Sequence, residues 1–167
     1  DFCVLGSGIA GSTIANLLSK KYSVHVFDKA RGAGGRSSNK KLKGNLSFDH
    51  GVQYISPKSK VFTKIIQKLS KKKILKTWEG NHLDFTFEKK KLIPKYIGLK
   101  ANNALSKYYL KNIKTFFSSQ IVKIEHKKYF WEIKLDDNSK HQFKALILTC
   151  PFPQLKKLAG RYLGKKI

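Results

Sequence analysis

Glycines with a spacing that suits phosphate binding stand near the start of the chain. Residues 6–11 read Gly-Ser-Gly-Ile-Ala-Gly, a GxGxxG pattern between an apolar run and a helical one. Gly6 permits a tight turn, Gly8 lets the backbone approach a pyrophosphate at the helix N-terminus, and Gly11 lets the helix pack closely on the strand. Asp28 ends the second apolar run, where a carboxylate accepts hydrogen bonds from ribose hydroxyls and repels a 2′-phosphate. Together these residues predict a binding site for an adenine dinucleotide.

A second glycine-rich segment follows and bears on which dinucleotide is bound. Residues 31–36 read Arg-Gly-Ala-Gly-Gly-Arg, so Arg31 and Arg36 flank a diglycine that ends at Gly35. Only three of the 35 basic residues are Arg, and two of them stand here. Arginine suits bidentate contacts with phosphate or flavin groups better than lysine does. NAD-dependent Rossmann enzymes normally pass from the second strand directly into another crossover, so this segment favours FAD over NAD.

A third motif, Phe48-Asp-His-Gly-Val-Gln-Tyr54, completes a recognisable combination. Together with the two glycine-rich segments and Asp28, it resembles the renalase group of FAD-dependent oxidoreductases, which are relatives of the flavin amine oxidases. Asp28 in place of the more usual Glu is a mild departure that keeps the charge. The resemblance continues through residues 78–80, 101–110, 120–124 and 148–153, and so covers nearly the whole chain.

The resemblance implies which residues bind the cofactor. The implied set is Gly6, Ser7, Gly8, Ala10, Gly11, Asp28, Arg31, Gly35, Arg36, Gln53, Tyr54 and Val122. In that family Ser7 and Ala10 would lie along the pyrophosphate loop, and Asp28 would hold the adenosine ribose. Arg36 would contact the cofactor, and Val122 would contact the adenine through its backbone.

The implied flavin-proximal residues are Gln53 and Tyr54. Beside them, Asp49 and His50 are adjacent, but neighbours on a strand point to opposite faces, so acid–base catalysis by the pair is not favoured. We expect a structural or flavin-proximal role for His50. Because the flavin carries the chemistry in such enzymes, no catalytic side chain is assigned.

Other residues that could do chemistry give weaker signals. The five histidines share no metal-ligand spacing, so no metal site is expected. Cys3 and Cys150 stand on apolar runs and are expected to be buried hydrophobic residues, although a Cys150 link to flavin is conceivable. The aromatic residues Trp78, Phe85, Phe87 and Tyr96 suit either a planar substrate pocket or the core of an antiparallel sheet.

The elements that position these residues follow from the hydrophobic pattern. Apolar runs at 2–5 and 23–28 flank a helical pattern at 9–20, which makes one βαβ unit. Residues 29–47 are rich in Gly, Ser, Lys and Asn and are expected to be mostly loop. A helix with apolar residues on one face is expected after Ser56-Pro57.

The rest of the chain predicts a mixed region and then a β-meander. Further elements are short strands within 74–97, a helix over 101–110, and strands at 113–117, 121–125, 129–135 and 143–149. The fold class is therefore α/β: a Rossmann-type FAD-binding domain with a β-meander, interrupted by part of an α+β substrate domain. The predicted domains are residues 1–55 and 113–167 for FAD binding and 56–112 for the partial substrate domain.

Length and composition limit the class of protein. The chain has 167 residues and enough apolar side chains, 41%, to bury a core. No apolar run is long enough to span a bilayer, and two distant cysteines make no disulfide framework, so we expect a cytoplasmic protein. Enzymes of the family are about twice this size, so we expect an N-terminal fragment that lacks the C-terminal half and that alone binds FAD weakly.

The formal net charge of +25 raises the question of a polyanion partner. The charge is almost all Lys and is scattered through every segment, which is typical of a solvated surface rather than a specific nucleic-acid reader. We therefore expect a small-molecule substrate and O₂ as partners, with no specific nucleic acid and no membrane span.

The leading hypothesis is an FAD-dependent oxidoreductase in which the flavin accepts a hydride at N5 and is reoxidised by O₂. The resemblance implies isomeric dihydro-NAD(P) as the substrate. One alternative is another amine-oxidase or desaturase-like flavoenzyme. An alternative of another class is a non-catalytic, Lys-rich polyanion-binding module on a Rossmann scaffold.

Overall fold

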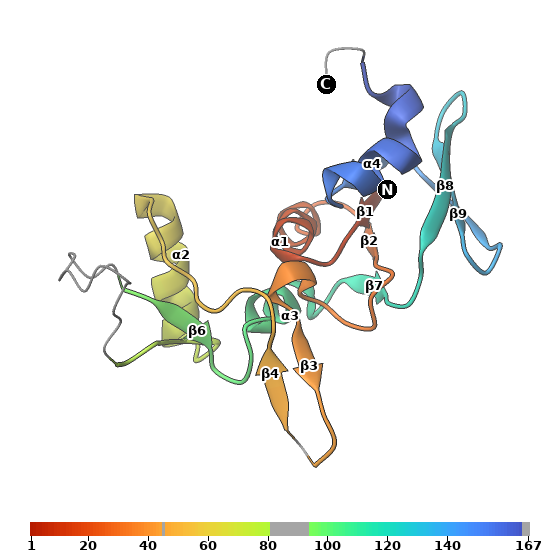
Figure 1. The fold of residues 1–167 in the computed structure, drawn as a ribbon. Coiled ribbons are helices and arrows are strands. Elements are labelled where there is room, and N and C mark those ends of the chain that lie inside the picture. Colours follow the sequence, from red (N-terminus) through yellow and green to blue (C-terminus); the bar gives the residue numbers. More distant parts are fainter. Residues whose placement is uncertain (45, 81–93, 165–167) are drawn as a thin grey trace. The chain divides into compact units, whose positions relative to one another are not determined.

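The computed structural model describes residues 1–44, 46–80 and 94–164, and the chain divides into two compact units (Figure 1). The first unit contains Asp1–Gly35 and Ser106–Ile167, and the second contains Arg36–Leu105. The first unit therefore depends on two chain segments that the fold brings together, whereas the second unit is one continuous segment. The functional boundaries at residues 55 and 112 stay a prediction.

The first unit is built on a four-stranded parallel sheet. Its strands are β1 (Phe2–Leu5), β2 (Val24–Phe27), β7 (Lys114–Phe116) and β11 (Ala145–Leu148), in the order β11-β1-β2-β7. The four strands predicted for a Rossmann sheet are all present, and the predicted fold class is confirmed. Because β1 lies between β2 and β11, the strand order reverses at β1. The loop after β1 thus occupies the switch point where open α/β sheets bind ligands.

A β-meander connects β7 to β11. Its strands are β8 (Ile121–His126), β9 (Trp131–Leu135) and β10 (Lys140–Phe143), which pair antiparallel in the order β10-β9-β8. The helix α4 (Phe152–Ala159) and the 3-10 turn η2 (Gly160–Tyr162) follow β11. The predicted meander is confirmed.

Side chains of the parallel sheet alternate between two apolar clusters, as the two-residue period of a strand requires. One cluster joins the sheet to the meander and α4, and contains Cys3, Phe27, Ile121, Ile124, Ile133, Leu135, Phe143 and Ala159. The other joins the sheet to the helix α1 (Ile9–Leu18), and contains Val4, Ala15, Val24, Val26, Ala33 and Leu110. The meander and α1 thus pack on opposite faces of β1 and β2.

The two cysteines differ from each other in burial. Cys3 is completely buried on β1, as predicted, and burial raises the pKa of its thiol to about 12. Cys150 lies beyond β11 and is only half-buried, so its prediction as a buried strand residue is wrong. The physical reason is that β11 ends at Leu148, and Cys150 is followed by Pro151, which has no backbone N–H to donate to a sheet ladder and precedes α4.

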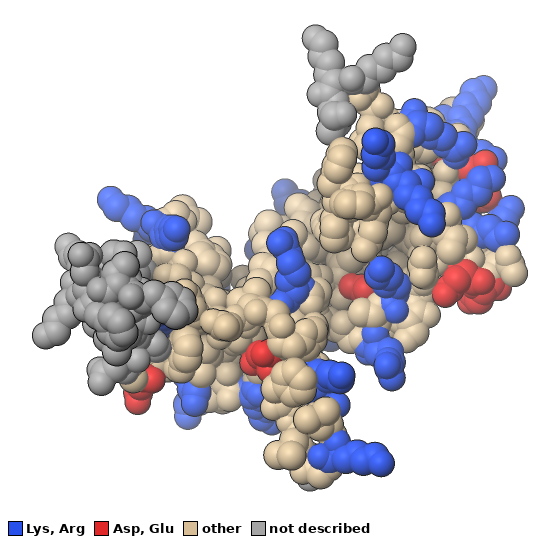
Figure 2. All heavy atoms as spheres, in the orientation of Figure 1, with Lys and Arg blue, Asp and Glu red and all other residues tan. Residues whose placement is uncertain are grey.

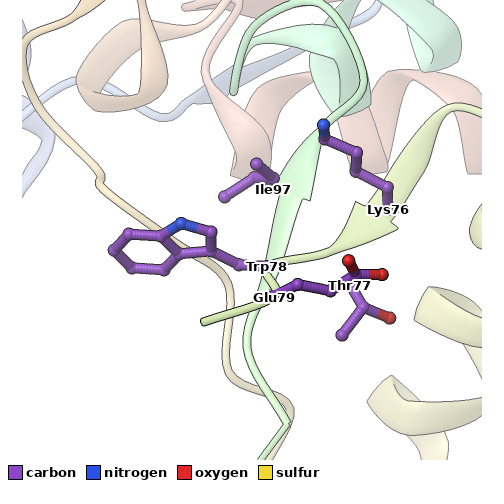
Figure 3. Close-up of a pocket in the computed structure, with 5 residues that line it drawn as sticks. All are labelled: Lys76, Thr77, Trp78, Glu79 and Ile97. Atoms are coloured by element: carbon purple, nitrogen blue, oxygen red, sulfur yellow. The ribbon is translucent and has the colours of Figure 1, made fainter. Parts of the chain in front are cut away.

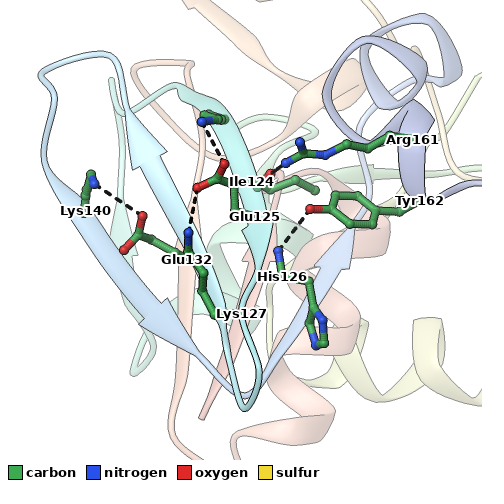
Figure 4. A network of polar contacts seen from close by, with 9 residues as sticks. Ile124, Glu125, His126, Lys127, Glu132, Lys140, Arg161 and Tyr162 are labelled. Carbon is green, nitrogen blue, oxygen red and sulfur yellow. Dashed lines mark hydrogen bonds and ion pairs between the residues drawn. The ribbon is translucent and has the colours of Figure 1, made fainter.

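Polar contacts attach η2 to the meander (Figure 4). The Arg161 guanidinium donates to the Ile124 carbonyl at 2.7 Å, and the His126 backbone N–H donates to the Tyr162 hydroxyl at 3.0 Å. On the same sheet Glu125 accepts from Lys123 and Lys127, and these hydrogen bonds lower its pKa to about 2. The one arginine outside the second glycine-rich segment is therefore structural.

The second unit contains two short hairpins and a helix. The strands β3 (Asn39–Lys41) and β4 (Ser47–Asp49) pair antiparallel, as do β5 (Leu75–Thr77) and β6 (Tyr96–Gly98). The helix α2 (Lys60–Lys71) packs against β5, and α3 (Ala104–Leu110) crosses into the first unit. The strands predicted at 83–87 and 92–93 lie outside the described residues.

Residues 29–47 are mostly loop, as predicted, but they also contribute the strand β3 and the start of β4, a hairpin that was not predicted. These strands consist of Asn, Lys, Ser, Phe and Asp, which have low β-propensity apart from Phe48 and show no clear alternation. Pairing here depends on backbone hydrogen bonds between two strands, a signal that periodicity cannot report.

Basic side chains occur on both units. Figure 2 shows Lys and Arg spread across the face in view, with far fewer Asp and Glu. Within the described residues, no helix combines the length and apolar character needed to cross a membrane.

Candidate dinucleotide-binding site

The first glycine-rich loop is closed tightly onto the ends of β1 and β11. Gly6 has a φ of +105°, a conformation that is unfavourable for any residue with a Cβ. A Cβ on Gly6 would lie 2.6 Å from Thr149 Oγ1, and a Cβ on Gly11 would overlap the Gly6 carbonyl oxygen. Thr149 Oγ1 donates to the Leu5 carbonyl at 2.8 Å and so links the loop to the sheet. Backbone conformation and close packing therefore both require glycine here.

The N-terminus of α1 suits an anion. Gly8 is its N-cap, and no side chain of the described residues caps it. The first turn contains no acidic residue. The N–H groups of a first turn have no partner within the helix, and the helix dipole places partial positive charge on them. A pyrophosphate is the kind of ligand that this end can hold.

The second glycine-rich segment lies directly against the first. The Gly34 backbone N–H donates to the Ser7 carbonyl at 3.1 Å, and Gly8 and Gly34 form an isolated parallel bridge. Gly35 has a φ of +53°, and a Cβ there would lie 3.1 Å from the Gly8 Cα. Two motifs separated in the sequence by α1 and β2 thus form one backbone surface, which we call the glycine cradle (residues 6–11 and 33–35).

Asp28 lies beside the glycine cradle at the end of β2. Its Oδ2 accepts from the Ser7 backbone N–H at 2.7 Å and from Ser7 Oγ at 2.5 Å, and its Oδ1 accepts from the Ala30 backbone N–H at 2.9 Å. The carboxylate is half-buried. The structure therefore brings Asp28 to the loop that the GxGxxG spacing predicts.

The two arginines of the second segment are exposed. Within the described residues neither the Arg31 nor the Arg36 guanidinium has a hydrogen bond or an ion pair, whereas the Arg36 carbonyl accepts from the Val52 N–H at 2.9 Å. A Cβ on Gly51 would overlap that same carbonyl oxygen. The end of the second glycine-rich segment is therefore fixed to the Asp49–Tyr54 motif through the backbone.

Asn102 holds the Asp49–Tyr54 motif in place. It is 2% exposed, and its Nδ2 donates to the Val52 and Gln53 carbonyls at 2.8 and 2.9 Å. Its Oδ1 accepts from the Gly98 N–H at 2.9 Å, and its own N–H donates to both Asp49 oxygens at 3.1 Å. Sequence reasoning missed this residue, because the helix predicted over 101–110 includes it, whereas α3 begins only at Ala104.

Asp49 and His50 have structural partners. Besides Asn102, the Asp49 carboxylate accepts from Asn39 Nδ2 at 3.1 Å across the β3–β4 hairpin. His50 Nε2 is 3.1 Å from Ser38 Oγ. The two side chains therefore make separate contacts, as expected for neighbours in extended backbone.

Gln53 and Tyr54 are exposed at the end of this motif. The Tyr54 and Trp78 rings lie 5.7 Å apart, and Lys95 Nζ lies 4.5 Å from the Tyr54 ring centre. Beside them is a concave surface that encloses a volume of about 520 Å³. It is lined by Asp49, Gln53, Lys76, Trp78, Ile97, Gly98, Leu99, Lys100, Ala101 and Asn102. A second hollow of about 260 Å³ shares three of these residues (Figure 3). Trp78 therefore borders the predicted flavin-proximal residues, and the space beside it can admit a small molecule.

Val122 lies at an irregularity of β8. The register of β8 on β9 shifts between Ile121 and Lys123, so Val122 has no opposite residue in β9, and its side chain is 47% exposed. Backbone groups that are not paired with a neighbouring strand can form hydrogen bonds with the edge of a ligand instead. The adenine contact of Val122 stays a prediction.

Cys150 follows Thr149 near the glycine cradle. Burial raises the pKa of its thiol, although its own backbone N–H and Lys29 act in the opposite direction. The thiol form therefore dominates at neutral pH. In the part of the chain that the structure describes, no three His, Cys, Asp or Glu residues are grouped to hold a metal ion.

Comparisons with known proteins show which family model and which relative this chain matches. The family model of the NAD(P)-binding Rossmann-like domain matches residues 4–69. Mouse (Mus musculus) renalase is 30% identical over 175 residues, which cover 94% of this chain and 48% of renalase. The chain thus spans about half the length of this relative.

Solved structures show the same fold. A redesigned variant of putrescine oxidase superposes with a TM-score of 0.68 at 13% identity, over 95% of this chain and 60% of the oxidase. A protein described as a protoporphyrinogen oxidase, from Exiguobacterium sp. 255-15, gives a TM-score of 0.71 at 9% identity, over 95% and 61% of the two chains. The resemblance to the renalase group is confirmed by these findings. With a Rossmann-like dinucleotide-binding domain and this sequence identity, the chain is a homologue of renalase.

Proposed function

We propose that this chain is the cofactor-binding part of an FAD-dependent oxidoreductase of the renalase type. The observation that carries the proposal is the glycine cradle, in which two separate glycine-rich segments meet beside Asp28 and the open N-terminus of α1. A single GxGxxG loop suits any dinucleotide, whereas the second segment adds Gly34 and Gly35 to the same backbone surface and is followed in the sequence by Arg36, a residue type that suits bidentate phosphate contacts.

The residues present fit an adenine dinucleotide in charge and in space. The first-turn N–H groups of α1 would hold the pyrophosphate, and Gly8 and Gly35 let the two glycine-rich segments approach each other there because neither carries a Cβ. Asp28 would accept from the ribose hydroxyls, and Arg36 would donate to the cofactor. Val122 would contact the adenine through its backbone, and Gln53 with Tyr54 would approach the flavin.

When bound, FAD would supply the redox chemistry: a hydride is accepted at N5, and two electrons are then passed to O₂, which is reduced to hydrogen peroxide. The contribution of this chain is to bind and orient, and no side chain is required to act as a general base. We infer isomeric dihydro-NAD(P) as the substrate class, oxidised to NAD(P)⁺. Renalase as a relative supports that assignment.

The cofactor is tested on the full-length protein. The purified protein is expected to be yellow and to release FAD into the supernatant when it is denatured. Release of NAD instead of FAD, or a flavin that stays on the polypeptide, would contradict the proposal. Peroxide formation with dihydronicotinamide dinucleotides, with amines and with no substrate then separates the proposed activity from that of an amine oxidase.

The substrate space is tested at Trp78. Because the indole borders the concave surface beside Gln53, Trp78→Ala is expected to raise KM about tenfold while the FAD content stays unchanged, since stacking on an aromatic side chain contributes about 1–3 kcal/mol per base. Tyr129→Ala removes an aromatic ring that is 77% exposed on the meander side and serves as the control. An unchanged KM in Trp78→Ala would remove this surface from the proposal.

A further inference from the structure

Ser7 makes contacts that a phosphate-binding serine would not make. Its side chain is completely buried, and its hydroxyl donates to Asp28 Oδ2 at 2.5 Å. The backbone N–H of the same residue donates to the same oxygen at 2.7 Å. A hydroxyl has one proton to donate, so the Ser7 proton is committed to Asp28 rather than to a pyrophosphate.

The Ser7 contacts also set the direction of the Asp28 carboxylate. Oδ2 has two donors from Ser7, and Oδ1 has the Ala30 N–H at 2.9 Å. An ionised carboxylate has about four acceptor positions, so these three leave capacity for a ligand hydroxyl. Hydrogen bonds to a charged group are the stronger class, and three of them on one short side chain leave it little freedom to rotate.

We infer that Ser7 is a positioning residue that holds the Asp28 carboxylate in the orientation in which it binds the ribose of the cofactor. The inference rests on the proposed function, and it changes the role of Ser7 from a pyrophosphate contact to an orienting group. Asp is one methylene shorter than the Glu that most flavoproteins carry here. A short acid has fewer conformers that reach a ligand, and a fixed one loses less entropy on binding.

The test compares two serines of equal burial in the full-length apoprotein. Ser12 is also completely buried, but its hydroxyl donates to the Ile9 carbonyl at 3.1 Å within α1. Ser7→Ala is expected to raise the Kd for FAD about tenfold or more, because one charge-assisted hydrogen bond is lost. Ser12→Ala is expected to change it by about twofold or less, because it removes only a neutral bond within a helix. Equal effects of the two substitutions would overturn the inference.

A double-mutant cycle separates positioning from a general effect on the loop. In an Asp28→Asn background the charged partner is absent, so Ser7→Ala is expected to change Kd by about threefold or less. The same loss in both backgrounds would overturn the inference. Ser7→Cys keeps a side-chain donor, although a weaker one on a larger atom, so its Kd is expected between those of the wild type and Ser7→Ala. Thermal melting of the apoproteins shows that the variants are folded.

ADP as a second probe makes failure of this inference distinguishable from failure of the proposed function. ADP carries the ribose and two phosphates but no flavin. If the wild type binds ADP and not FAD, the proposed cofactor is wrong, and the Ser7→Ala against Ser12→Ala comparison with ADP still decides the role of Ser7. If the wild type binds neither, both the proposed function and the role of Ser7 are wrong.

Discussion

At the scale of single residues, Arg36 is the basic side chain with the strongest reason to bind the cofactor. Its backbone is fixed by Val52, while its guanidinium has no hydrogen bond or ion pair within the described residues. We predict that Arg36→Ala weakens FAD binding by about 1.5–3 kcal/mol, the range for hydrogen bonds to charged groups. Lys40→Ala and Lys41→Ala on β3 are the controls and are expected to change binding little, because solvated lysines contribute little. Equal flavin occupancy in all three variants would identify an ordinary basic loop.

Substitution of Asn102 should lower the free energy of unfolding more than substitution of other residues of the second unit. It donates to two carbonyls and accepts one N–H while almost fully buried, so Asn102→Ala leaves three backbone groups without that partner. We predict that unfolding free energy falls by about 2–4 kcal/mol, from the cost of unsatisfied buried groups. Urea denaturation measures the change. Asn112→Ala removes an exposed Asn and should leave the midpoint in place; a similar midpoint for both variants would contradict the assignment.

At the scale of elements, the contact between the parallel sheet and the meander contains a titratable ring. His25 on β2 lies 5.5 Å from the Phe143 ring and 5.9 Å from the Phe116 ring. Burial, and then the positive charge of Lys114, lowers the pKa of His25 below its ordinary value of 6.5. As the pH falls through 6.5, His25 takes up a proton in the unfolded chain before it does so in the folded one. The free energy of unfolding therefore falls as the pH drops through this range.

We predict that this pH dependence is lost in His25→Phe, which keeps an aromatic ring between Phe116 and Phe143. The expected result is a smaller fall in the urea midpoint between pH 7 and pH 5 than in the wild type. His126→Phe on the meander is the control and should retain the wild-type slope. A wild-type slope in His25→Phe would show that another group is responsible.

At the scale of the whole molecule, the net charge of +25 predicts attraction to polyanions without a specific site. Figure 2 shows the basic side chains spread over the surface rather than confined to one element. We predict that binding to heparin weakens at least about tenfold between 50 and 200 mM salt, because counterion release dominates such binding. The Kd for FAD should change by about threefold or less, since shape and hydrogen bonds carry it. A steep salt dependence for RNA together with no flavin binding would favour the polyanion-binding alternative.

Local sequence patterns were sufficient to predict the parallel strands, α1 and the meander of the first unit, but not α4 or η2. Gly6, Gly8 and Gly11 predict the turn because only glycine allows a positive φ and close packing there. Asp28 is predicted at the end of β2 because hydrophobic runs show where a strand stops. The strands β1 and β11 are apolar throughout, as strands buried on both faces are, and β2 and β7 are the more mixed strands of the predicted sheet.

The tertiary structure decided which segments meet. Gly34 pairs with Gly8, and Asn102 binds the backbone at Val52 and Gln53, across separations that no periodicity reports. The β3–β4 hairpin formed where the residues predicted a loop, because its stability comes from pairing rather than from propensity. The motif likewise did not indicate that the Ser7 hydroxyl donates to Asp28. Local patterns encode conformation, whereas hydrogen-bond partners depend on contacts distant in sequence, and these exist only once the chain has folded.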